Sequence, residues 1–255
     1  MLTGIFIIVI VGLLGILSHR KSRLEEKIIK NVPLDDWLNI LGYPLGLYIG
    51  WYMIIRNIVG RPYISLSFYD DIDVLAVNSL FLVYGFVGNA MHFNAKVLWR
   101  YLRKDKRSTV YRINEMFHNK LSHYLIFLNA LFIIFMLPVL EINHPADTSL
   151  RSSYIGLLLL GGIGVGYAAS KMVFYTNEWF GGYNKPLFIV SLVFLTMLTA
   201  VFRVTRYPLD HYPVSIFVVA ILGSIIITFI IRQFFIFARL GSKRRLRFMA
   251  RMLSV

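Results

Sequence analysis

Long apolar runs, separated by short charged segments, make up most of this 255-residue chain. A helix needs roughly 20 apolar residues to cross the ~30 Å hydrocarbon core of a bilayer. Most of the runs approach or exceed that length. The pattern predicts an all-α fold, a polytopic transmembrane helical bundle of about seven helices. It forms a single transmembrane domain over residues 1–255, with spans near residues 2–17, 37–59, 74–98, 121–141, 154–174, 187–202 and 214–238.

Positive charge is distributed unevenly among the segments that join these runs. If the spans alternate in direction, 22 of the 27 Lys and Arg residues fall on one side of the membrane and 5 on the other. Connecting segments rich in Lys and Arg remain on the cytoplasmic side. The distribution therefore predicts an N-terminus outside and a cytoplasmic C-terminus. The composition also favours a membrane protein, because 57% of the residues are hydrophobic and only 16% are charged.

The first apolar run, residues 2–17, is short for a span and is followed at once by Arg20, Lys21 and Arg23. A secretory signal carries its positive charge before the apolar core and small residues at a cleavage site after it. The order found here favours an uncleaved anchor over a signal peptide.

The charged segment after this run, residues 19–37, is mildly amphipathic. It predicts an interfacial helix on the cytoplasmic face, and a solvated linker is the alternative. Asp35 and Asp36 follow a proline, which is typical of the first turn of the next helix. The apolar residues at helical spacing are Leu24, Ile28 and Ile29.

The most basic part of the chain, residues 92–124, holds eight Lys or Arg residues against two acids. Together with the basic tail it predicts a surface facing anionic lipid headgroups, each cation contributing about 1 kcal/mol. No nucleic-acid-binding motif accompanies this charge, so nucleic acid is not an expected partner. The lipid-facing residues we expect are Arg100, Arg103, Lys104, Lys106, Arg107, Lys243, Arg244, Arg245 and Arg247.

The chain contains no cysteine, which excludes disulfides, thiolate metal sites, iron–sulfur ligation and c-type haem attachment. The glycine-rich run GGIGVG at 161–166 lacks the preceding strand and the following Lys-Ser/Thr of a phosphate loop. Gly162, Gly166 and Ser170 instead recur every four residues on one helix face. Such a stripe predicts close packing against another helix.

Two histidines, His92 and His123, fall near the inner ends of the third and fourth predicted spans. Ionisable groups at that depth are costly and mark pathways, ligands or partners. The pair predicts a site for a cofactor, a b-type haem or a metal, or else a proton or solute pathway. The alternative is structural, with each ring bonded to a backbone carbonyl or to Asn89, Asn94 or Asn119.

The loops on the outer side gather carboxylates and histidines. If these loops converge, carboxylate oxygens there suit a hard cation such as Ca²⁺, Mg²⁺ or Mn²⁺. Their spacing matches no metal motif, so the alternative is a set of solvated residues at helix ends. The set comprises Asp70, Asp71, Asp73, Glu141, His144, Asp147, Asp210 and His211.

Three short segments on the predicted outer side also resemble the motifs of the type-2 phosphatidic acid phosphatases. They follow one another along the chain in the order of those motifs and lie on the expected side of the membrane. The resemblance implies a membrane lipid phosphatase with a phosphohistidine mechanism, in which His211 belongs to the last motif. Thr148 and Ser215 stand where the family has His and Asp, and the basic residue before Arg61 is missing, which implies a degenerate member. The pieces are GRP (60–62), HPADTS (144–149) and RVTRYPLDHYP (203–213).

No convincing catalytic set emerges from these residues, so the chain is more consistent with a protein that is not an enzyme. We predict a multispanning non-catalytic subunit or scaffold of a larger membrane complex, with protein partners. The alternatives are a small transporter or a proton or ion pathway using inner-leaflet histidines, and a membrane enzyme, either a haem or quinone protein or a degenerate lipid phosphatase. A bacterial inner membrane is the default location, and an organelle inner membrane is the alternative.

Overall fold

The computed structural model describes residues 1–18, 24–64, 69–175, 184–204, 208–241, 244–245 and 248. Almost all of its regular structure is helical. The elements are α1 (Leu2–Ser18), β1 (Ile28–Ile29), β2 (Val32–Pro33), α2 (Leu34–Trp37), the π-helix η1 (Leu38–Gly42), α3 (Tyr43–Val59), α4 (Asp71–Leu102), α5 (Thr109–Glu115), the π-helix η2 (Met116–Leu121), α6 (Ser122–Ile142), α7 (Ser152–Tyr175), α8 (Asn184–Val204), the 3₁₀ turn η4 (Leu209–His211) and α9 (Pro213–Ala238).

Six helical segments in the described part of the chain are long and apolar enough to cross a bilayer. They support a multispanning integral membrane protein, while the count of seven spans and their orientation remain predictions. The shorter apolar helix is residues 2–17. The six segments are Leu34–Val59, Asp71–Leu102, Thr109–Ile142, Ser152–Met172, Pro186–Arg203 and Pro213–Ala238.

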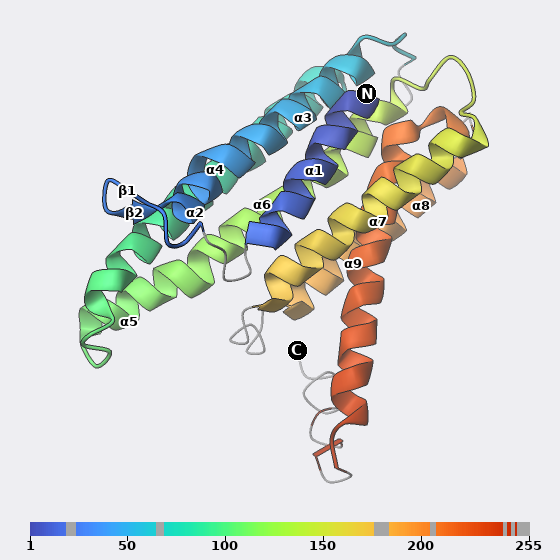
Figure 1. Ribbon diagram of the computed structural model, residues 1–255. Helices are drawn as coiled ribbons and strands as arrows, with labels where there is room; N and C mark the ends of the chain where they lie inside the picture. The colour runs from blue at the N-terminus through green and yellow to red at the C-terminus, as the bar shows by residue number, and fades with distance from the viewer. Residues whose placement is uncertain are drawn as a thin grey trace.

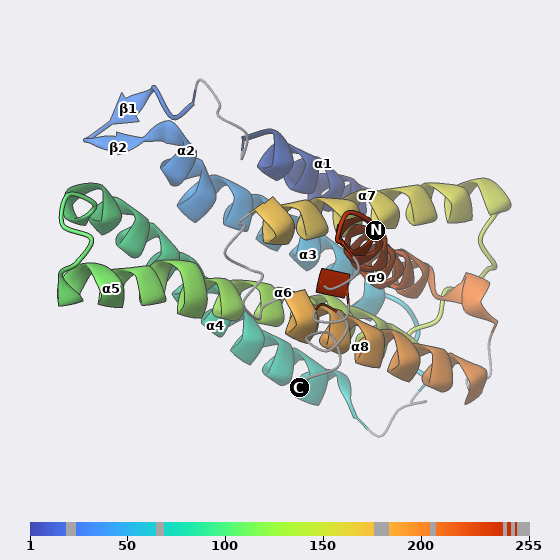
Figure 2. The ribbon, with the colours of Figure 1, turned by 90° about the horizontal axis from the view of Figure 1, so that it is seen from below.

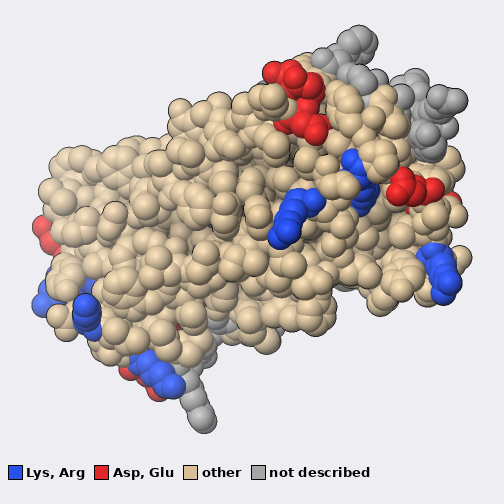
Figure 3. All heavy atoms as spheres, turned by 90° about the horizontal axis from the view of Figure 1, so that it is seen from above, with Lys and Arg blue, Asp and Glu red and all other residues tan. Residues whose placement is uncertain are grey.

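The long helices run up and down between two ends of the molecule (Figure 1). We call one the Arg61 end: it holds Met1, Arg61, the start of α4, the end of α6 and the start of α9. We call the other the basic end, which holds the β1–β2 hairpin and the turn at 103–108. Charged side chains gather towards the two ends of the face in Figure 3, and a broad uncharged stretch separates them.

The basic stretch is more helical than the apolar pattern predicts. α4 continues to Leu102, and α5 begins at Thr109, so the connecting turn is confined to 103–108. Ser108 is the N-cap of α5, because its Oγ accepts a hydrogen bond from the Tyr111 N–H at 3.2 Å. α5, η2 and α6 then form one continuous helical segment. Figures 1 and 2 show α4 and α6 side by side as a long helical hairpin.

The predicted interfacial helix at residues 19–37 is wrong where the structure describes this segment. Ile28 and Ile29 form β1 and pair antiparallel with β2. The turn between them places Lys30 and Asn31 at φ of 49° and 64°, the left-handed conformation that two-residue hairpin turns require. Trp37 of α2 is bound to the hairpin, because its Nε1–H donates to the Ile29 carbonyl at 3.1 Å.

α1 packs within the bundle, against α3 and α7. A Cβ added to Gly4 of α1 would lie 2.6 Å from the carbonyl oxygen of Gly50 in α3. The two helices therefore approach each other through glycine faces, as transmembrane helices commonly do.

Gly162 and Gly166 of α7 lie directly against α9. An added Cβ would come within 2.5 Å of the Phe217 carbonyl oxygen at Gly162 and within 2.4 Å of the Ile221 carbonyl oxygen at Gly166. Ser170, the third residue of the stripe, is buried and donates its hydroxyl to the Gly166 carbonyl at 2.8 Å. α9 supplies much of the buried core, so this contact joins α7 to the centre of the bundle.

Replacing Gly166 by Leu is expected to lower the thermal unfolding temperature, because its Cβ would meet α9 backbone that cannot move aside. Overpacking of this kind costs about 1–3 kcal/mol. Gly164→Leu is the matched control, since a Cβ there has nothing within 4 Å. Equal unfolding temperatures for the two purified variants would contradict the α7–α9 contact.

Candidate functional site

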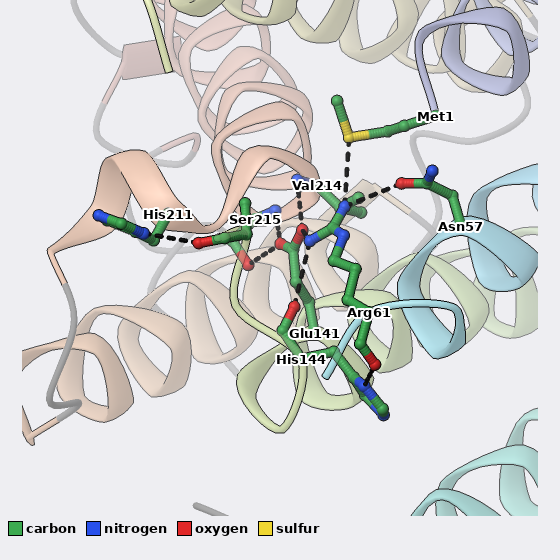
Figure 4. Close-up of polar contacts among 9 residues, drawn as sticks. Met1, Asn57, Arg61, Glu141, His144, His211, Val214 and Ser215 are labelled. Carbon is green, nitrogen blue, oxygen red and sulfur yellow. Dashed lines mark hydrogen bonds and ion pairs between the residues drawn. The ribbon is translucent and has the colours of Figure 1, made fainter. Parts of the chain in front are cut away.

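A buried carboxylate, Glu141 near the end of α6, organises the Arg61 end (Figure 4). Its side chain is fully buried. Oε1 accepts from Arg61 Nη1 at 2.9 Å and from the Val214 N–H at 3.1 Å, and Oε2 accepts from the N–H and Oγ–H of Ser215, both at 2.8 Å. The first N–H groups of a helix lack partners within it. Glu141 therefore caps α9 from another helix while pairing with a cation.

Arg61 is fully engaged in the same cluster. Besides Glu141, its guanidinium donates to the His144 carbonyl at 3.1 Å and to Asn57 Oδ1 at 3.1 Å, and it meets Met1 Sδ at 3.5 Å (Figure 4). Burial, and secondarily the charge of Arg61, lower the pKa of the Met1 amino group. Arg61 thus joins α1, α3, α6 and α9 at one point.

His144 contacts Asp71 next to this ion pair. His144 is 2% exposed, and its Nδ1 lies 3.1 Å from the Arg61 carbonyl oxygen, which can only accept, so Nδ1 donates there. Its Nε2 lies 2.8 Å from Asp71 Oδ2. The contact holds the start of α4 against the residues that follow α6.

Two further residues of the set of carboxylates and histidines, Asp70 and His211, make local contacts. Asp70 caps α4, since its Oδ1 accepts from the Asp73 N–H at 2.8 Å. His211 Nδ1 lies 2.7 Å from the Ala146 carbonyl oxygen, outside the Glu141 contacts. No group of three His, Cys, Asp or Glu among the described residues is arranged to hold a metal ion. We therefore do not propose the hard-cation site.

The pieces that resemble phosphatase motifs meet at the Arg61 end, as far as the structure describes them; residues 205–207 lie outside the described part. Arg61, which belongs to the first of these pieces, is bound to Glu141. Ser215, at the position of the family's Asp, donates to the same carboxylate rather than to His211. In the described part of these pieces, Arg61 and Ser215 both bind Glu141 and form a structural junction, so the phosphatase alternative is not carried further.

Three histidines meet in the α4–α6 hairpin. The ring of His92 in α4 lies 4.7 Å from that of His118 in η2 and 4.7 Å from that of His123 in α6, measured between centroids. The rings of His118 and His123 are 6.1 Å apart. We call these residues the histidine cluster. It contains both histidines predicted from the sequence and one, His118, that the sequence did not single out.

The π-helix explains why His118 joins the cluster. Residues five apart point about 140° away from each other on an α-helix, but the wider turn of a π-helix aligns them. η2 therefore turns His118 to the same side as His123. His123 Nδ1 lies 3.1 Å from the Asn119 carbonyl oxygen, which fixes the orientation of that ring. Pi-helical turns are frequent at functional sites.

The histidine cluster is polar, but not all of its ring nitrogens have hydrogen-bond partners among the described residues. Nδ1 of His92 and Nδ1 of His118 are buried without a hydrogen-bond partner in the part of the chain that the structure describes. The arrangement of His92 and His123 does not fit a bis-histidine haem. Such a haem holds its two ligands on opposite faces of the macrocycle, whereas the ring centroids of His92 and His123 are only 4.7 Å apart. A haem between these two rings is not proposed.

Buried ion pairs lie beside the cluster and join α2 to α4. Asp36 is 2% exposed, and its carboxylate contacts Lys96 at 2.5 Å and also Arg100. Lys96 additionally lies 3.7 Å from Asp35, which is 3% exposed. The predicted first-turn acids are thus present at the start of α2, but they are buried because α4 supplies two cations.

The expected lipid-facing cations differ in their surroundings. Arg100 is partly buried and pairs with Asp36. Arg103, Lys104, Lys106 and Arg107 are exposed around the 103–108 turn. Arg244 and Arg245 are also exposed, and Lys243 and Arg247 lie outside the described residues.

Replacing Glu141 by Gln is expected to destabilise the protein by about 3–5 kcal/mol, because Arg61 would keep a buried charge without its counter-ion. The measurement is thermal unfolding of the purified variant in detergent. Arg56→Gln, an exposed arginine in the last turn of α3, is the control and should change little. Wild-type stability of Glu141→Gln would refute the junction.

Comparison of the chain with protein-family models, with curated proteins and with solved structures finds no match.

Proposed function

We propose that this multispanning membrane protein provides a transport pathway for a small ion, with the histidine cluster as its exchange site. The observation that supports the proposal is the meeting of three imidazole rings within one helical hairpin. Ionisable groups at membrane depth are costly and are kept where they serve a pathway or a partner. A purely structural role accounts poorly for two buried ring nitrogens that have no hydrogen-bond partner among the described residues.

Imidazole suits this role because it can bind a proton on one nitrogen while releasing one from the other. His92 lies ten residues before the end of α4, about 15 Å along the helix axis. Lys96 and Asp36 lie between it and the basic end. They supply the charged groups through which the cluster reaches water on that side.

Reconstituted vesicles test the pathway. Substituting His92 by Ala is expected to abolish the flux of protons and of alkali cations that the wild-type protein supports, because the central ring of the cluster is lost. Asn94→Ala, an exposed neighbour in the same helix turn, is the control. Unchanged flux in the His92 variant would refute the proposal.

The same proposal places the basic end in the cytoplasm, where the exposed cations of the 103–108 turn would contact anionic headgroups. The support is the excess of Lys and Arg at this end and the rule that such segments stay inside. A bacterial inner membrane is the proposed location.

The absence of cysteine makes this orientation directly measurable. A Cys introduced at the exposed Asp105 is expected to react with an impermeant thiol reagent only after the cells are opened, and a Cys at the exposed Asp147 is expected to react in intact cells. The opposite labelling pattern would overturn the orientation.

A second proposal, membership in a larger membrane complex, is favoured by a groove between α7 and α9. It has a volume of about 400 Å³ and is lined by small and apolar residues, including Ala220, Gly223 and Ser224. Surfaces of small residues let another transmembrane helix approach closely. The proposed occupant is a helix of a partner subunit.

Gly223→Leu tests this proposal selectively, because a Cβ at Gly223 has no described atom of this chain within 4 Å. We expect wild-type folding but loss of a stoichiometric partner after gentle purification from native membranes. Retention of the partner, or a wild-type protein that purifies alone as a monomer, would count against it.

A further inference from the structure

The β1–β2 hairpin exposes two isoleucines at the basic end. Ile28 is 66% exposed and Ile29 is 48% exposed, although both residues belong to the paired strand β1. Successive side chains of a strand point to opposite faces, so each face of this short strand presents an apolar side chain. Apolar surface of this kind is stabilised by an environment that removes it from water.

The hairpin is fixed to the bundle rather than free to choose its surroundings. The Leu34 N–H donates to the Lys27 carbonyl at 2.7 Å, in addition to the bond from Trp37 to the Ile29 carbonyl. The Trp37 ring lies 5.5 Å from the ring of Phe93 in α4, measured between centroids. These contacts set the level of the isoleucines along α4.

Two helices place that level at the edge of the bilayer core. α4 begins at Asp71, and Phe93 follows 22 residues later, which is about 33 Å along the helix axis and close to the ~30 Å thickness of the core. The segment Leu34–Val59 is 26 residues long, also enough to cross, and the hairpin joins it directly at Leu34. Trp37 fits this level, because tryptophan is enriched among the lipid headgroups.

The hairpin projects sideways from the bundle. Figures 1 and 2 both show it at the side of the molecule, next to α2. The next large apolar side chains to be exposed along the chain are Leu41 and Leu45, at 59% and 58%, as expected of residues that face acyl chains. The isoleucines therefore lie just beyond lipid-facing residues, where the bilayer core meets the headgroups.

The charged residues around the isoleucines suit the same environment. Lys27 and Lys30 flank them and are exposed, and a long Lys side chain can keep its ammonium group among lipid phosphates while its neighbours enter the acyl region. Glu25 and Glu26, also exposed, balance these two charges. The contact therefore depends on apolar burial more than on an anionic headgroup.

We propose that the β1–β2 hairpin is a lipid anchor, with Ile28 and Ile29 inserted at the boundary between the headgroups and the acyl chains of the bilayer that the bundle spans. The basic 103–108 turn lies farther out, because Leu102 is nine residues, or about 14 Å, beyond Phe93 along α4. The hairpin, and not this turn, meets the acyl region. This anchor does not depend on the transport function proposed above.

A single introduced cysteine tests the anchor, since the chain has no other. Ile28→Cys in the full-length protein carries a bimane fluorophore and is reconstituted in phosphatidylcholine liposomes. We expect emission at shorter wavelength than from Asp105→Cys, quenching by phosphatidylcholine brominated near the headgroup end of its acyl chains, and loss of quenching by aqueous iodide. Asp105→Cys, on the exposed turn, is the matched control and should be quenched by iodide.

Ile29→Cys is a second site with the same expected pattern, and the exposure of both isoleucines means that neither replacement should disturb folding. Equal iodide quenching at Ile28 and Asp105 would overturn the anchor. Shielding of the Ile28 label from both iodide and brominated lipid would also overturn it, because protein would then cover the hairpin. Protection in native membranes but not in liposomes would assign the isoleucines to a partner protein instead.

Discussion

The ion pair between Arg61 and Glu141 is the contact on which the Arg61 end depends. One carboxylate satisfies a guanidinium, two backbone N–H groups at the start of α9 and a hydroxyl. A buried charge is tolerated only when its partners are this complete. Because the contact joins the ends of α3, α6 and α9, it holds the C-terminal end of α6 in place, and with it His144 against Asp71 at the start of α4.

The two ends of the α4–α6 hairpin use polar groups differently. At the Arg61 end, both carboxylate oxygens of Glu141 accept hydrogen bonds, and the cluster around Glu141 has a structural role. In the histidine cluster, by contrast, two ring nitrogens stay buried without described partners. Such a site lowers stability, so its persistence within a membrane helix pair points to function. The fixed end holds α4 and α6 in register around the proposed exchange site.

Hydropathy located the apolar helices and both His92 and His123, since apolar length and the rarity of ionisable groups are local properties of the sequence. His118 was missed because its orientation depends on the π-turn of η2, which leaves no sequence signal. The β-hairpin at Ile28–Pro33 was missed because hydrophobic spacing over so few residues resembles a helix. The Arg61–Glu141 pair joins residues 80 positions apart, and only the folded chain reveals it.

The most direct test of the account is ion flux through the unmodified protein. Liposomes containing it should dissipate an imposed gradient of protons or of an alkali cation faster than protein-free liposomes. Equal rates with and without the protein, for both kinds of gradient, would contradict a transport pathway through the histidine cluster.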